Sequence, residues 1–122
     1  MKVIYSAFDV GSRNVFQISS ENEAYYFDIF NVDDKKKKYG VSIIVNFDAL
    51  NNLVDYLNKK EVAFYLERSC HSELFKFLFI DDETLFVDCF RDYDYKKTSA
   101  NFVELNKHQI ELLCKTLSEE II

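Results

Sequence analysis

Two apolar segments that each end on a carboxylate constrain this chain more than any other feature of its sequence. Residues 2–8 are mostly apolar and stop at Asp9, and residues 62–66 are apolar and stop at Glu67. A carboxylate at the tip of an otherwise buried strand loses much of its hydration, so it must be paired or hold a cation. Asp9 and Glu67 are therefore the first candidates for functional residues.

Composition is typical of a single soluble domain in a reducing compartment. The 122 residues, 48% of them hydrophobic, fit one compact domain with an ample core. Cys70, Cys89 and Cys114 show no CxxC spacing, which argues against a disulfide framework and a zinc knuckle. The sequence has no apolar run near the roughly 20 residues of a membrane span and no signal-peptide pattern. We expect an intracellular, cytoplasmic protein without membrane contact. Its net charge is −6, so any contact with DNA would require a locally basic face.

The apolar pattern predicts a strand-rich first half. Residues 3–8 are apolar on both sides, as in a strand buried on both faces, and residues 15–20 pair with them as an antiparallel hairpin. Residues 24–32, rich in aromatic and branched side chains, form a third strand. The four consecutive lysines at 35–38 indicate a solvated turn first and a phosphate contact second.

Two amphipathic helices are predicted further along. Residues 48–60 place apolar side chains at i, i+3 and i+4, and Asn46 or Asp48 can cap this helix. A final helix spans about residues 107–119, where Asn106 and the glutamine three positions later suit a capping box.

The chain also repeats itself at a spacing of sixty residues. Residues 20–30 align with 80–90, and the helix at 50–57 aligns with 110–117, without a gap. Taken literally, this gives two strand-strand-strand-helix units, which resembles the tandem architecture of whirly and PUR-type single-stranded nucleic-acid binders. Four aromatic residues of these segments could stack on bases, as in single-strand binders, although a core or subunit-interface role is the plainer interpretation. These aromatics are Tyr26, Phe30, Phe86 and Phe90.

A second resemblance rests on two short motifs. FDVGSRN at residues 8–14 resembles the first-strand motif of RNase H-fold nucleases of the RuvC type, most closely Holliday-junction resolvases of poxviral and mitochondrial kind. YLER at residues 65–68 resembles the fourth-strand motif of that family, in which the glutamate is catalytic. The resemblance is weak beyond Phe90. It implies one RNase H-like domain over residues 1–122, an α/β fold with a mixed five-stranded sheet in the order 3-2-1-4-5 flanked by helices.

This resemblance implies a metal-dependent endonuclease that acts on branched DNA, with a symmetric homodimer as the expected assembly. Parallel first and fourth strands would place Asp9 and Glu67 side by side to bind Mg²⁺ or Mn²⁺, with Asp9 bridging two ions. Gly11 would allow close approach of the substrate backbone. The expected substrate contacts are Gly11, Ser12, Arg13, Arg68, Lys96 and Lys97.

The C-terminal end departs from the family pattern. RuvC-type enzymes complete the site with two acids, or a His and an acid, three residues apart on the last helix. His108 and Glu111 have this spacing, with Glu111 as a further metal ligand, and they equally suit a solvated helix face. If they are only solvated, the chain is a weakened nuclease or a catalytically silent relative that binds or inhibits a protein partner.

Residues 69–79 discriminate between the predicted folds, because alternating phenylalanines suit a strand while other apolar residues in the segment have helical spacing. A helix there would be the crossover that an RNase H-like sheet needs. A strand there would support the tandem binder. The leading prediction is the resolvase-type nuclease, with the silent relative and the tandem binder as alternatives.

Overall fold

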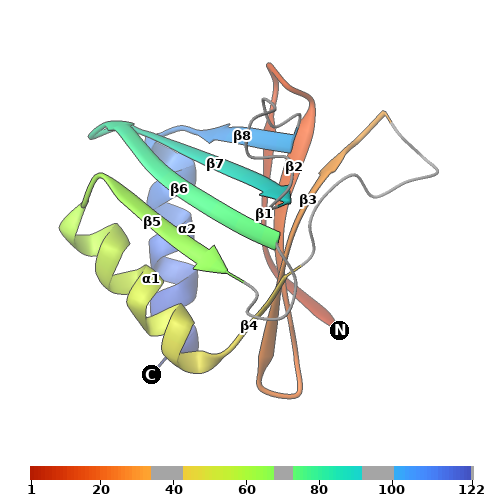
Figure 1. Ribbon diagram of the computed structural model, residues 1–122, viewed down its shortest axis with the longest axis vertical. Helices are drawn as coiled ribbons and strands as arrows, with labels where there is room; N and C mark the ends of the chain where they lie inside the picture. Colours follow the sequence, from red (N-terminus) through yellow and green to blue (C-terminus); the bar gives the residue numbers. More distant parts are fainter. Residues whose placement is uncertain (34–42, 68–72, 92–100, 122) are drawn as a thin grey trace.

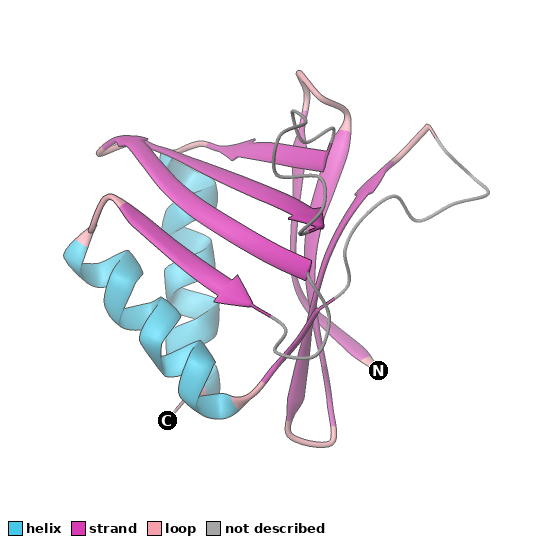
Figure 2. Cartoon of the chain, in the orientation of Figure 1, coloured by secondary structure: helices cyan, strands magenta, loops and turns pink. Residues whose placement is uncertain are grey.

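The computed structural model describes residues 1–33, 43–67, 73–91 and 101–121. In these ranges the chain forms a unit of four strands and one helix, and then forms it again (Figures 1 and 2). The first unit consists of β1 (Lys2–Asp9), β2 (Asn14–Glu21), β3 (Ala24–Asn31), β4 (Ile43–Val45) and α1 (Phe47–Lys59). The second consists of β5 (Ala63–Glu67), β6 (Glu73–Asp81), β7 (Thr84–Arg91), β8 (Asn101–Leu105) and α2 (Lys107–Glu120).

Each unit contributes one antiparallel sheet. The strand orders are β1-β2-β3-β4 and β5-β6-β7-β8, so within each sheet the strands lie side by side in the order of the sequence. The expected mixed five-stranded sheet is therefore wrong. Among the described strands, β1 pairs only with β2, and no parallel pair brings a first strand beside a fourth.

The segment that discriminated between the folds is largely a strand. β6 occupies most of residues 69–79, where the RNase H-like expectation required a crossover helix. Phe75 and Phe77 point into the core and are completely buried, while Lys76 between them is only half-buried. This alternation buries one face of the segment in a sheet, and it outweighs the helical spacing of Leu74 and Leu78.

The sixty-residue repeat predicted from the sequence is a structural repeat. Both helices begin after an asparagine, and Asn46 accepts a hydrogen bond from the N–H of Ala49 at 2.8 Å as Asn106 does from that of Gln109 at 2.9 Å. Gln109 also completes the predicted capping box. A register shift between Phe79 and Asp81 displaces the repeat by one residue within β6.

Because of that shift, Phe75 in the second sheet takes the place that Phe16 has in the first. Phe16 pairs with Ile29 of β3, and Phe75 pairs with Cys89, sixty residues after Ile29. The two rings meet at the centre of the molecule with centroids 6.2 Å apart. Burying a large apolar side chain of this kind contributes about 2–3 kcal/mol.

The second sheet crosses the first, and both helices lie together on one side (Figure 1). β8 lies against β1, β2 and β3, so the core is enclosed between the two sheets and the helices. Tyr5 and Tyr25 connect the first sheet to α2, since their hydroxyls donate to the Gln109 carbonyl at 2.9 Å and to Glu120 Oε2 at 3.1 Å. Neither described helix has the length and apolar content needed to cross a membrane.

Candidate nucleic-acid interface

The segment that resembles a nuclease motif connects the two sheets. Asp9 ends β1, and its Oδ1 atom accepts a hydrogen bond from the N–H of Gly11 at 3.0 Å. Its Oδ2 atom accepts the N–H of Glu104 at 3.0 Å and lies 2.9 Å from the hydroxyl of Ser12. The carboxylate therefore closes the β1–β2 turn and holds β8 of the other sheet.

Two further side chains bind the same strand. Asn14, only 2% exposed, donates from Nδ2 to the Phe102 carbonyl at 3.0 Å. The single hydroxyl proton of Ser12 can be donated to this carbonyl at 3.1 Å or to Asp9. Asn31 donates to Asn14 Oδ1 at 3.0 Å and so fixes the orientation of its amide.

We call Asp9, Ser12 and Asn14, with the backbone groups of Phe102 and Glu104 that they bind, the sheet clamp. β8 is the edge strand of the second sheet, and these two backbone groups point away from its partner β7. An uncovered strand edge is a template for pairing with another chain. The sheet clamp covers this edge and fixes the crossing of the two sheets.

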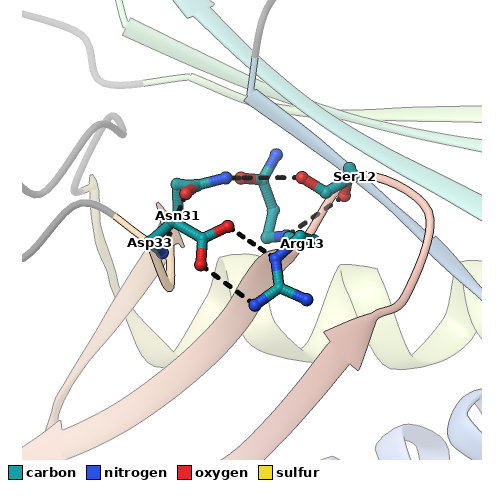
Figure 3. Close-up of polar contacts among 5 residues, drawn as sticks. Ser12, Arg13, Asn31 and Asp33 are labelled. Atoms are coloured by element: carbon teal, nitrogen blue, oxygen red, sulfur yellow. Dashed lines mark hydrogen bonds and ion pairs between the residues drawn. The ribbon is translucent and has the colours of Figure 1, made fainter.

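Arg13 lies beside the sheet clamp and is already paired. Its guanidinium donates two hydrogen bonds to Asp33, of 2.5 and 2.9 Å (Figure 3). The hydrogen bond raises the pKa of Arg13 above its usual range and lowers the pKa of Asp33. Arg13 also lies over the Phe8 ring, with its Cζ atom 6.0 Å from the centroid.

The proposed catalytic residues are spread over different elements. Asp9 belongs to the first sheet, while Glu67 ends β5 in the second, and the side chain of Glu67 lies outside the described parts. His108 and Glu111 are exposed on α2. The side-by-side strands that were to bring Asp9 and Glu67 together are absent from the described sheets.

The other predicted contacts and the metal ion remain predictions. Arg68, Lys96 and Lys97 lie outside the described residues. The φ angle of Gly11 is not positive, and a Cβ atom added there would lie 3.5 Å from Asp9 Oδ1, an ordinary van der Waals contact. The turn itself therefore does not require glycine. Within the described ranges no three His, Cys, Asp or Glu side chains gather as a metal group.

Both sheets turn one face away from the core, and both outward faces carry aromatic rings. On the first sheet Phe8 is 41% exposed, and Tyr26 and Phe30 are half-buried on β3. On the second, Phe86 and Phe102 stack with centroids 4.9 Å apart and planes 19° from parallel. Tyr65, on the edge strand β5, is 51% exposed.

Polar side chains occupy the middle of each outward face. Gln17 and Asp28 are direct cross-strand partners on the first sheet. On the second, Lys76 lies between Tyr65 and Asp88 in one row across three strands. We call these surfaces the first and second outer faces.

The sequence pointed to some of these residues and missed others. Tyr26, Phe30 and Phe86 were candidates for stacking, but Tyr65 and Phe102 were not. Successive side chains of a strand point to opposite faces, so residues two positions apart share a face. This alternation could have identified Tyr65 and Phe102, because each lies two positions from another outward residue of its own strand.

Comparison with solved structures gives the same architecture. No protein-family model and no curated protein matches this sequence. The MRP1/MRP2 crystal structures from Trypanosoma brucei match with a TM-score of 0.62 and 11% identity, over 87% of this chain and 72% of that one. A guide-RNA-binding protein complex bound to a gRNA matches with a TM-score of 0.59 and 11% identity, over 88% and 78%.

The fold is therefore the tandem one. The resemblance to RuvC-type resolvases is wrong, because the matching structures and the observed pairing both give two antiparallel sheets in place of an RNase H-like sheet. The nuclease, resolvase and hydrolase functions rested on that resemblance and lose their support with it. At 11% identity the likeness to MRP1/MRP2 shows the fold alone.

Proposed function

We propose that the protein binds single-stranded nucleic acid, RNA above all, on its two outer faces. The observation that carries this proposal is the aromatic surface of the second outer face, where Tyr65, Phe86 and Phe102 point away from the core. Bases stack on such rings with about 1–3 kcal/mol each, whatever the base. The matching structure bound to a gRNA supports the same use of the fold.

The charge of the chain favours stacking over phosphate contacts as the source of affinity. The net charge is −6, and the tips of the β2–β3 and β6–β7 turns are acidic and exposed. Lys76 is the one Lys or Arg among the described strand residues of the two outer faces. Because each neutralised phosphate steepens the salt dependence of binding, we expect a shallow salt dependence. The acidic residues at the turns are Glu21, Glu23, Asp81, Asp82 and Glu83.

Titration of a fluorescently labelled 20-nucleotide single strand of mixed sequence, followed by anisotropy, tests the proposal. Tyr65→Ala should weaken binding at least five-fold, since it removes one stacking platform. Phe47→Ala is the matched control, because Phe47 is 45% exposed but belongs to α1 and not to a strand of either outer face. A duplex of the same sequence should bind more weakly than the single strand.

Two results would contradict the proposal. One is a wild-type protein that binds neither single-stranded RNA nor single-stranded DNA at micromolar concentrations. The other is an equal loss of affinity in Tyr65→Ala and Phe47→Ala. Either would leave the acidic surface as a site for a basic protein partner, which was the remaining alternative from the sequence.

A further inference from the structure

The two outer faces share a pattern that stacking alone does not explain. In β3 the sequence Tyr-Phe-Asp-Ile-Phe begins at Tyr26, and sixty residues later β7 carries Phe-Val-Asp-Cys-Phe from Phe86. Asp28 and Asp88 thus have equivalent positions, each between aromatic residues two places away. A protein that held only phosphates would gain nothing from a carboxylate at this point.

Asp28 is the better described of the two. It is half-buried on the first outer face, opposite Gln17 and between the half-buried rings of Tyr26 and Phe30. Its carboxylate forms no hydrogen bond or ion pair with the residues that the structure describes. The nearby cation at the end of this face, Arg13, is bound to Asp33.

The described strand residues of this face include no Lys or Arg. A phosphate placed here would meet a negative carboxylate without a compensating charge. The bases of a bound strand, and not its phosphates, should therefore face Asp28. Residues i and i+2 of a strand are about 6.6 Å apart, so a base stacked on either ring brings its edge close to the carboxylate.

Carboxylate chemistry distinguishes among the bases. A carboxylate has two acceptor oxygens and no donor. Guanine offers two adjacent donors on its Watson–Crick edge, N1–H and the N2 amino group, and can bind both oxygens. On the same edge, adenine and cytosine have one amino group next to an acceptor nitrogen, and uracil has one N–H between two carbonyl oxygens. Each of these three bases therefore places an acceptor against the carboxylate.

We infer that Asp28 selects guanine in single strands bound to the first outer face, while Tyr26 and Phe30 hold the base by stacking. This inference rests on the proposed function and names the base that the site prefers. Asp28 acts here as a specificity residue: it contributes less to binding of any strand than to the difference between guanine and other bases.

The test compares three RNA 12-mers by anisotropy: uracil only, uracil with three isolated guanines, and the same with inosine in place of guanine. Inosine lacks only the N2 amino group, so it removes one of the two hydrogen bonds. The wild type should bind the guanine strand about five-fold more tightly than the inosine strand. Asp28→Asn, which retains the shape but presents one acceptor oxygen, should bind both equally.

Asp55→Asn is the control, because it removes the same charge from an exposed position on α1 and should keep the five-fold preference. Equal wild-type binding of the guanine and inosine strands would overturn the inference while leaving the proposed function intact. Retention of the preference in Asp28→Asn would also overturn it. A wild type that binds none of the three strands would contradict the proposed function itself.

Discussion

Asp9 offers a sharp test of the sheet clamp, because one carboxylate accepts hydrogen bonds within its own turn and from the opposite sheet. Asp9→Ala removes the acceptors of the Gly11 and Glu104 N–H groups and one of two acceptors near Ser12. Each hydrogen bond makes a net contribution of about 0.5–1.5 kcal/mol to stability. The hydrogen bonds from Gly11 and Glu104 to Asp9 are exposed to solvent. We expect a total loss of about 2 kcal/mol in the free energy of unfolding.

Urea unfolding followed by circular dichroism measures this loss, and the melting temperature should fall by about 6–10 °C. Asp9→Asn keeps one acceptor oxygen, so about half of the loss is expected. Asp82→Ala is the control, since Asp82 is an exposed carboxylate in the β6–β7 turn whose side chain forms no hydrogen bond with the described residues. Hydrogen exchange should show faster exchange at the Glu104 amide in both Asp9 variants.

The sign of the Asp9→Asn effect is decisive. If Asp9 were one of two crowded carboxylates at a metal-free site, its neutralisation would relieve their repulsion and stabilise the protein. The sheet clamp predicts the opposite, since an acceptor is lost. A stability of Asp9→Ala equal to that of Asp82→Ala, or a gain in Asp9→Asn, would refute the clamp as a source of stability.

Two further predictions concern the turns and the tyrosines. Glu23→Gly should raise the free energy of unfolding by about 0.5–1 kcal/mol in the same urea assay, because Glu23 has a φ of 65° that glycine adopts without strain. Burial raises the pKa of Tyr56 to about 12, and that of Tyr5 is raised as well. The folded state therefore favours the neutral phenols, so stability should be unaffected below about pH 10 and fall as the pH approaches 12. Tyr56→Phe should flatten that decline, and an unchanged decline in both Tyr56→Phe and Tyr5→Phe would contradict this assignment.

The sequence by itself determined the local elements. Asparagine caps and apolar spacing gave both helices, and the hairpin of β1 and β2 followed from the turn between two apolar runs. The sixty-residue alignment gave the repeat, because each unit needs the same local signals at the same spacing. These features depend on residues a few positions apart, so local sequence is enough to find them.

Only the tertiary structure decided which sheet each strand joins and what Asp9 does. The run around Phe75 and Phe77 suits a helix or a strand until β5 and β7 pair with it on both sides. Asp9 was predicted to be a metal ligand because the neighbouring sequence shows only that it is an acidic residue at the end of an apolar strand. The N–H group that binds it across the sheets belongs to Glu104, 95 residues away. A short motif carries no information about such a distant partner, and the partner determines whether a carboxylate at a strand end binds a cation or a backbone.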